Sequence, residues 1–329
     1  MLKFNVYLYN TRKLESFCAF MVTQAPFRYP FLRHLSIAGF YPMPSSESIS
    51  QLVEILTHAS RLQTLHLSCY DLLKSDHRLQ AACSSLTSIK EFHMCWNEGP
   101  VFQAQDPLYK MLKQMQSPLV RADLRFFRCN DGIGLDLATL LHSTATLEDL
   151  TVSNIAFQSE LQFPRLRKLS FSTINYPPLA LTARIFPNLT DLTILRDMDH
   201  LNAENDRYRQ LNRSVQLAGG GWTSLDRLTG WPLDLYSLGL TCPIRCVKIF
   251  VYSHNHELVA DILSDCRPSQ IDIVFNDIFP SVRCLSDEVA ARLTYLRCTI
   301  HLIYFDRNPI ALVSATHYAF RRLVADTMM

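Results

Sequence analysis

The sequence predicts an α/β solenoid, in which short parallel strands stack into a sheet and the segments between them cover one side of it. Three observations predict this class. Leucine makes up 49 of the 329 residues, apolar residues recur at a fixed spacing, and segments with helical spacing lie between the recurrences. Membrane spans also raise the leucine content, but no stretch of about 18 residues is uniformly apolar and free of charge. A repeat therefore accounts better for the leucine excess.

The repeat places apolar residues at positions i, i+3 and i+5. Clean copies occur at Leu32/Leu35/Ile37, Leu62/Leu65/Leu67, Ile89/Phe92/Met94, Leu147/Leu150/Val152, Leu166/Leu169/Phe171, Leu189/Leu192/Ile194 and Ile244/Val247/Ile249. Weaker copies start at Leu119 and Leu225, and Ile271/Ile273 and Leu293/Leu296 are degenerate C-terminal copies. Positions i+3 and i+5 share one face of a strand, and position i lies on the turn before it.

A strand with one apolar face can bury that face only against stacked neighbours. The pattern therefore predicts an irregular leucine-rich-repeat horseshoe, with a parallel sheet on the concave face and helices and turns on the convex face. The alternative is that the triplets are independent strands of another α/β fold. Such repeats usually carry Asn or Cys at i+8, and here only Asn97 matches, so we expect uneven curvature.

The segments between the strands are expected to return mostly as helices. Ser45 and Ser46 suit the cap of a helix over 47–59, and Pro107 suits the first turn of the next helix. Segments 135–141 and 256–263 also have helical spacing. Repeats of 19 residues leave no room for a full helix, so they are expected to return by a turn or a 3₁₀ segment.

The chain is expected to have a cap at each end, because the terminal repeats of a solenoid expose core. The predicted parts are an N-terminal capping strand and helix (1–30), leucine-rich repeats (31–196), a polar insertion loop, helical in part, that ends in a Gly triplet (197–221), irregular C-terminal repeats (222–308) and a C-terminal capping helix (309–329). Because the sequence starts inside an expected strand, it is expected to represent a truncated or alternative start.

Composition and motifs exclude several functions. The formal net charge of +2 gives no electrostatic footprint for nucleic acid or an anionic membrane. The sequence contains no nucleotide-binding loop, no Ser-hydrolase motif and no zinc-protease motif, so we expect neither a cofactor nor an enzyme. The 10 Cys are scattered without a Cys-x-x-Cys pair, and no secretory signal opens the chain. These features predict free thiols in the cytoplasm or nucleus rather than secretion.

The strand positions between the apolar ones predict a binding surface. Positions i+2 and i+4 point away from the core, and neighbouring strands lie about 4.8 Å apart. His66, His93 and Asp123 are therefore expected to form one row, with Glu91, Arg121 and Asp149 beside it. The candidate partner-binding residues are His34, His66, Glu91, His93, Arg121, Asp123, Asp149 and Lys168. A metal or acid/base site is the alternative, but the mixed charges favour recognition of a protein, and no metal site is assigned.

Several segments resemble fungal F-box/leucine-rich-repeat proteins. The opening Val6-Tyr-Leu-Tyr-Asn, followed by Arg12-Lys-Leu-Glu-Ser-Phe-Cys, is similar to the segment just after the F-box in that family. The repeats FPRLRKLSF (163–171) and FPNLTDLTI (186–194) have its Phe-Pro-x-Leu-x-x-Leu form, and segments 222–228, 235–240 and 242–245 are similar to its C-terminal half. The resemblance covers most of the chain and implies a substrate receptor of a cullin-type ubiquitin ligase.

The F-box itself is not seen, because no Leu-Pro-x-Glu-Ile-type helical segment precedes the repeats. Docking to a Skp-type adaptor is therefore expected only if an F-box lies upstream. The expected function is binding of a protein partner or ubiquitination substrate. An enzyme with an unrecognised site on the concave face and a stand-alone structural scaffold remain the alternatives.

Overall fold

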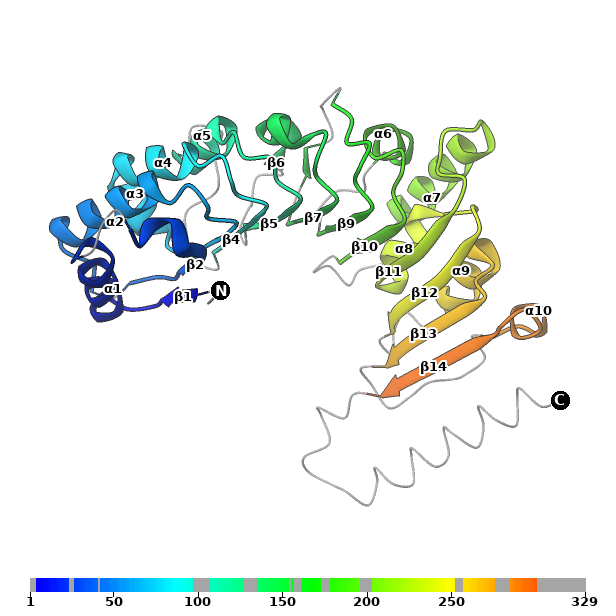
Figure 1. Ribbon diagram of the computed structural model, residues 1–329. Coiled ribbons are helices and arrows are strands. Elements are labelled where there is room, and N and C mark those ends of the chain that lie inside the picture. Colours follow the sequence, from blue (N-terminus) through cyan, green and yellow to red (C-terminus); the bar gives the residue numbers. More distant parts are fainter. Residues whose placement is uncertain are drawn as a thin grey trace, which may run out of the picture. The chain divides into compact units, whose positions relative to one another are not determined.

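The computed structural model describes residues 4–23, 27–40, 42–96, 107–126, 135–153, 155–156, 161–172, 178–195, 203–251, 257–275 and 285–300. The chain divides into two compact units, Met1–Arg167 (unit 1) and Lys168–Met329 (unit 2). Each unit is a stack of parallel strands with helices along one side of its sheet (Figure 1). The predicted α/β leucine-rich-repeat solenoid is confirmed in both units.

In the described part of unit 1, the main sheet follows the chain order, β1-β2-β3-β4-β5-β7, and every pair is parallel. Its strands are β1 (Phe4–Leu8), β2 (Leu32–Ile37), β3 (Thr64–Leu67), β4 (Glu91–Trp96), β5 (Arg121–Phe126) and β7 (Asp149–Val152). The helices are α1 (Thr11–Thr23), η1 (Tyr29–Phe31), α2 (Ser46–His58), α3 (Tyr70–Ser75), α4 (His77–Ser84), α5 (Pro107–Gln114) and η2 (Leu137–Ser143). Two short strands, β6 (Leu135–Asp136) and β8 (Ile155–Ala156), pair separately.

The apolar triplets form the core of unit 1, as the spacing predicts. Equivalent positions lie opposite one another in successive strands, and the i+3 row runs through Leu35, Leu65, Phe92, Ala122 and Leu150. All five are at most 3% exposed. Burying such apolar side chains is the main favourable contribution to folding, at roughly 1.5–3 kcal/mol for each large one. The weak copy that starts at Leu119 is therefore a full repeat, with Ala122 as its small member.

Three predicted segments of unit 1 fold as expected. The N-terminal strand and helix are β1 and α1, and Leu14, Cys18 and Met21 of α1 are buried. The helix predicted over 47–59 is α2, whose cap residue Ser45 accepts a hydrogen bond from the Ser48 amide. The helix predicted from Pro107 is α5.

The helix predicted over 135–141 is wrong in type. Leu135 and Asp136 form β6, and the helix that follows, η2, is a 3₁₀ helix with non-helical dihedral angles at Leu140. Asp136 explains the tight start, because its carboxylate accepts from the Ala138 amide and its carbonyl accepts from the Thr139 hydroxyl. Such local side-chain bonds compete with a regular α-helix.

Buried and half-buried hydroxyls connect the turns that precede the strands of unit 1. We call Ser88, Ser117, Ser143 and Thr146 the hydroxyl ladder. Ser88 donates to the Leu62 carbonyl, Ser117 to Leu86, Ser143 to Ser117, and Thr146 to Leu119. Ser117 and Ser143 also accept hydrogen bonds from the amides of Ile89 and Leu119. Hydroxyls thus tie neighbouring turns together here, whereas the expected Asn97 lies outside the described residues.

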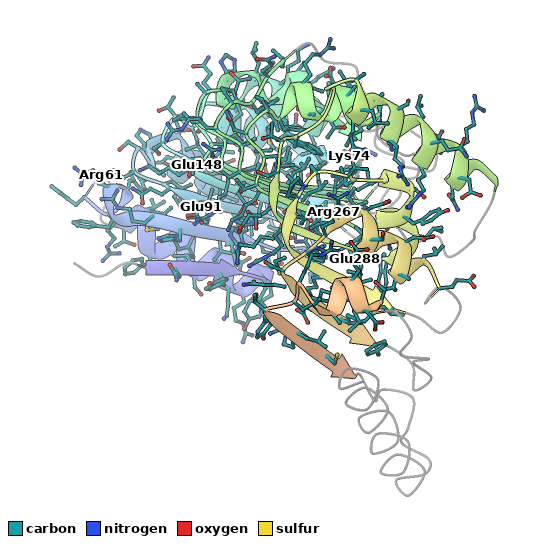
Figure 2. All side chains as sticks on the ribbon, turned by 90° about the vertical axis from the view of Figure 1, so that its right-hand side faces the viewer. Arg61, Lys74, Glu91, Glu148, Arg267 and Glu288 are labelled. Carbon is teal, nitrogen blue, oxygen red and sulfur yellow. The ribbon has the colours of Figure 1, made fainter. Side chains whose placement is uncertain are left out.

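The described part of unit 2 repeats the same plan, with the parallel order β9-β10-β11-β12-β13-β14. Its strands are β9 (Lys168–Phe171), β10 (Asp191–Ile194), β11 (Leu225–Gly230), β12 (Ile244–Val251), β13 (Gln270–Phe275) and β14 (Tyr295–Ile300). Its helices are α6 (Leu179–Ile185), α7 (Ala203–Leu217), α8 (Pro232–Leu238), α9 (Leu258–Cys266) and α10 (Asp287–Ala290). The helix predicted over 256–263 is α9. It ends at Cys266, and the cap residue that follows, Arg267 (labelled in Figure 2), has a positive φ of 47°.

The expectation that a 19-residue repeat lacks a helix is wrong for the repeat that starts at Leu225. The two-turn helix α8 follows β11 almost at once, because Pro232 stands at its first turn. Gly239, with a φ of 53°, closes the helix in the left-handed conformation that suits glycine. Because Pro232 starts the helix and Gly239 closes it, a seven-residue helix fits into the short repeat.

The polar segment over 197–221, expected to be a surface insertion that is helical in part, contains the 15-residue helix α7. One side of this helix is buried although it is polar, because Asn205, Arg209 and Asn212 are at most 8% exposed. Asn212 accepts a hydrogen bond from the Leu179 amide and donates to the Ser237 carbonyl. The helix therefore packs against its neighbours partly through the hydrogen bonds of Asn212, which a hydrophobicity pattern does not reveal.

Two further expectations concern the end of the chain and membranes. The predicted capping helix over 309–329 lies outside the described residues. In the part of the chain that the structure describes, each helix is too short or too polar to cross a membrane.

Candidate functional site

The candidate site is the side of the unit 1 sheet that faces away from the helices, which we call the open face. Two outward residues from each strand form it: Asn5 and Tyr7, His34 and Ser36, Thr64 and His66, Glu91 and His93, Arg121 and Asp123, Asp149 and Thr151. Core residues alternate with them along each strand, so the period of two that buries the leucines also exposes this polar set.

The pairing register brings the predicted rows together. His66 lies opposite His93 and His93 opposite Asp123. Glu91 lies opposite Arg121, and Arg121 opposite Asp149. Six of the eight candidates are thus neighbours on β3, β4, β5 and β7, as predicted from the spacing. Whether they bind a partner stays a prediction.

Two candidates lie elsewhere. His34 is on β2, opposite Thr64. Lys168 belongs to unit 2, where it is exposed on β9 and lies opposite Asp191 of β10.

A chain of contacts runs along one row of the open face. The rings of His66 and His93 lie 4.0 Å apart, centre to centre, and are tilted by 43°. His93 Nδ1 lies 3.7 Å from Asp123 Oδ2, and Arg125 Nε donates to Asp123 Oδ1 over 2.8 Å. Asp123 therefore orients His93, and His93 in turn holds the ring of His66 in place.

The carboxylates of this face have cationic partners. Glu91, labelled in Figure 2, forms an ion pair with Arg121. Burial alone would raise the pKa of the Asp123 carboxyl, but the His93 and Arg125 side chains outweigh it and hold that pKa below its usual value. Burial lowers the pKa of His66, and His93 lowers it further, whereas Glu91 and Asp123 act in the opposite direction. His66 is therefore mainly neutral at pH 7.

We expect His66 to make unit 1 less stable in mild acid. Its pKa in the folded chain lies below the ordinary 6.5, so the unfolded chain binds more protons once the pH falls below about 6.5. The stability provided by the neutral ring is present above that pH and is lost as the pH falls through the folded pKa. His66→Gln should lose less stability than the wild type between about pH 7.5 and pH 5, measured by urea unfolding. His142→Gln, at an exposed position of η2, is the control and should follow the wild type.

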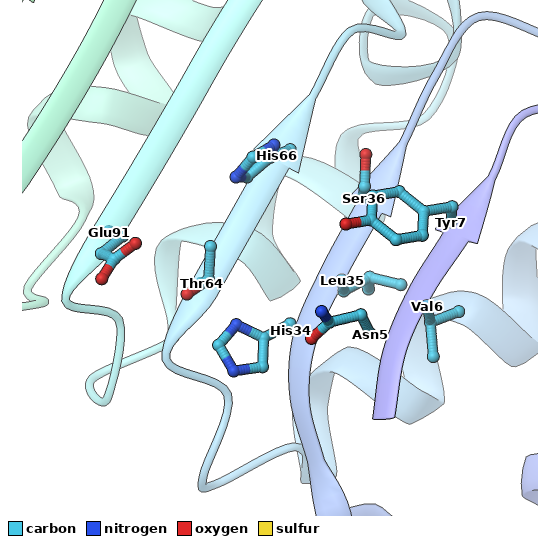
Figure 3. A pocket seen from close by; sticks show the side chains of 9 residues that line it. All are labelled: Asn5, Val6, Tyr7, His34, Leu35, Ser36, Thr64, His66 and Glu91. Carbon is cyan, nitrogen blue, oxygen red and sulfur yellow. The ribbon is translucent and has the colours of Figure 1, made fainter. Parts of the chain in front are cut away.

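A shallow pocket opens on the open face near β1, with a volume of about 140 Å³. Figure 3 shows the nine residues that line it, from strands β1 to β4: Asn5, Val6, Tyr7, His34, Leu35, Ser36, Thr64, His66 and Glu91. Three of them, His34, His66 and Glu91, are candidates from the sequence. His93 and Asp123 are not among the lining residues, so the pocket does not join the three groups that an acid/base site would need.

Asn5, Tyr7, Ser36 and Thr64 line the pocket but are not among the candidates from the sequence. Asn5 and Tyr7 precede the first clear repeat, so the template does not place them, although the alternation in β1 carries the same signal. Ser36 and Thr64 occupy outward positions of the template, but the template does not distinguish a small hydroxyl residue in a pocket from one on an open surface. Their position in the pocket follows from the pairing of β1, β2 and β3.

Metal binding has no support in the described residues, because no three His, Cys, Asp or Glu side chains come together there in a way that could hold an ion. What this face does offer is a broad set of half-exposed hydrogen-bonding groups with paired charges.

No protein-family model and no curated protein matches the chain. Among solved structures, the chain is similar to the crystal structure of a TLR13–ssRNA13 complex, with 12% identity and a TM-score of 0.37. The similarity covers 91% of this chain and 50% of that one, so the chain spans about half the length of the structure it matches.

Proposed function

We propose that this chain is a protein-binding module and that the open face of unit 1 binds its partner. One observation carries the proposal. Across six neighbouring strands the outward residues are polar, of mixed charge, and in register from Asn5 to Thr151. Polar groups spread over a broad surface suit recognition of another protein, in which complementary charges provide specificity.

The size of the pocket favours a protein partner over a small substrate. Sites for small molecules usually enclose about 300–1,000 Å³, whereas this pocket has about 140 Å³ and lies open on the sheet. It can take one side chain of a partner, as the central pockets of protein interfaces do. A deep pocket that joined His66, His93 and Asp123 would have favoured the enzyme alternative, and the pocket lining does not include the last two.

The more specific role we propose is recognition of substrates for a ubiquitin ligase. Its support is the resemblance of segments 163–171 and 186–194 to fungal F-box/leucine-rich-repeat proteins. We also propose a reducing setting in the cytoplasm or nucleus, because cysteines without disulfides are typical of proteins there. The eight described cysteines are all free.

Reversing the charge of Arg121 should weaken capture of the partner. Arg121→Glu places a second acidic group beside Glu91 and reverses the charge at the middle of the open face. We expect recovery of the partner to fall by about tenfold or more, which corresponds to ~1.4 kcal/mol. The measurement is affinity purification with quantitative mass spectrometry, supported by thermal melts that show both proteins to be folded.

Lys74→Glu is the matched control, since it makes the same charge change on the exposed side of α3 (Figure 2). If Arg121→Glu and Lys74→Glu retain the same partners equally well, the open face is not the binding surface.

This chain alone should not capture a Skp-type adaptor, because it contains no segment of the F-box form. The measurement is a pull-down with purified adaptor. The same chain with an F-box segment fused before Met1 is the positive control. Robust direct binding by the unfused chain would contradict the expectation.

A further inference from the structure

The pocket on β1 to β3 collects hydrogen-bonding side chains that have no side-chain hydrogen bond to another described residue. They are the Asn5 amide, the Tyr7, Ser36 and Thr64 hydroxyls, and the His34 and His66 rings. Thr64 is the most informative, because it is only 7% exposed and lies between His34 and His66 (Figure 3). The Thr64 hydroxyl has no hydrogen-bond partner among the described residues and is left to solvent, so an ionised acceptor in the pocket would gain a charge-assisted hydrogen bond there.

The charges around the pocket favour an acceptor ligand. Among the described residues that line it, Glu91 is the one carboxylate, and Arg121 neutralises it. The remaining polar groups can all donate: one amide, three hydroxyls and two imidazoles. Such a donor-rich pocket, without a free carboxylate of its own, fits a group that only accepts hydrogen bonds.

We propose that this pocket binds a carboxylate of the partner, with Ser36, Thr64 and His66 as the donors. This inference rests on the proposed function and deepens it by naming the chemistry of the ligand. The carboxylate comes from an Asp or Glu side chain or from a chain terminus. Either source presents the same two acceptor oxygens, at a size that about 140 Å³ accommodates.

Proton uptake by His66 strengthens the binding. The groups that face His66 are Tyr7 and His34 from β1 and β2, Glu91 and His93 from β4, and Arg121, Asp123 and Arg125 from β5. Burial and His93 outweigh Glu91 and Asp123 and lower the pKa of the His66 ring, and a carboxylate in the pocket adds a negative charge that favours the protonated ring. Affinity therefore rises as the pH falls below about 6.5, until Asp and Glu carboxylates themselves become protonated.

The test uses the full chain and three small probes, followed by NMR of the histidine ring signals. The probes are N-acetylglutamate amide, which carries a side-chain carboxylate, N-acetylglutamine, which carries a terminal one, and the neutral N-acetylglutamine amide. A carboxylate probe should give saturable shifts of the His34 and His66 signals and should bind about tenfold more tightly near pH 5.5 than near pH 7.5. The neutral probe should give none. Saturable binding of either carboxylate supports the proposal, and the tighter one identifies the source.

The isosteric variant Thr64→Val should weaken binding by about tenfold, because it removes one hydrogen bond to a charged group. Thr151→Val makes the same change on β7, outside the pocket, and should bind as the wild type does. His66→Phe should abolish the pH dependence, and Ser36→Ala replaces Thr64→Val if that variant does not fold.

Equal binding of the neutral probe, no saturable shift with either carboxylate, or full affinity in Thr64→Val and His66→Phe would each overturn the proposal. These results would leave the proposed function in place as long as Arg121→Glu still loses its protein partner.

Discussion

Gly230→Val should destabilise unit 2 by about 3 kcal/mol, measured by chemical unfolding. Gly230 ends β11 at the position where other repeats carry the third apolar residue of the triplet. A Cβ atom there would lie 2.7 Å from the Ile194 carbonyl oxygen and 2.8 Å from Leu235 Cδ2. The Leu235 side chain can turn aside, but the carbonyl belongs to the neighbouring strand β10 and cannot move without disturbing the sheet.

Gly39→Ala is the control, because the added Cβ would meet its nearest neighbour, the Ser68 carbonyl oxygen, at an ordinary 3.6 Å. It should change stability by less than about 0.5 kcal/mol. A second variant, Gly230→Ala with Leu235→Ala, removes the side-chain clash and keeps the backbone one. The prediction is contradicted if the free energy of unfolding of Gly230→Val lies within about 0.5 kcal/mol of the wild-type value. In that case, the space beside β10 is less tight than the distances indicate.

Arg209→Leu should cost about 3–5 kcal/mol, because it leaves Asp265 charged and largely buried without its main partner. Arg209 Nη2 lies 2.6 Å from Asp265 Oδ2, in an ionic contact rather than a well-aligned hydrogen bond, and the two side chains are 10% and 11% exposed. The same guanidinium donates to the Tyr236 carbonyl and stacks on the Tyr236 ring. Burial already raises the pKa of Asp265, against the effect of Arg209 and Arg213. The loss of Arg209 should raise it further.

Three variants separate charge from packing. Arg209→Lys keeps the charge but not the planar fork, so its cost should be intermediate. The double variant Arg209→Leu/Asp265→Leu removes both charges and should recover much of the loss. Arg207→Leu, at an exposed position of the same helix, should stay within about 0.5 kcal/mol of the wild type. A double variant no more stable than Arg209→Leu would show that stacking on Tyr236, rather than the ion pair, holds α7 in place.

Both of these sites show where sequence reasoning reached its limit. The period of the leucines predicted the strands, their buried faces and the helices α2, α5 and α9, because burial of apolar area is what the pattern encodes. Gly230 interrupts the apolar triplet of its repeat, and the structure gives the reason, because the missing side chain leaves room for Leu235 of α8. Arg209 lies in a polar segment, and no hydrophobic pattern distinguishes a buried, paired arginine from an exposed one.

The candidate site was predictable to a similar extent. Side chains alternate between the two faces of a strand, and neighbouring strands are evenly spaced. These two regularities place His66, His93 and Asp123 in one row without detailed knowledge of the fold. The pocket was not predictable, because it depends on the pairing of β1 with β2 and on the side-chain directions of Tyr7 and Thr64. The pairing register of the capping strand β1 with β2 is set by local packing. The repeat template does not extend to β1, so the sequence does not predict that register.

The hydroxyl ladder makes the repeats of unit 1 unsuited to exchange or deletion. In many repeat arrays, stability is nearly a sum of similar modules, so that a module can be removed and the ends rejoined. Here Ser117 accepts from the amide of Ile89 in the repeat before it, and Ser143 accepts from the amide of Leu119 in the same way. Removing one repeat would leave a buried amide of its neighbour without an acceptor. The array is therefore a sequence of non-identical parts whose order is set at their turns, and a shortened version would need a new hydroxyl at the junction.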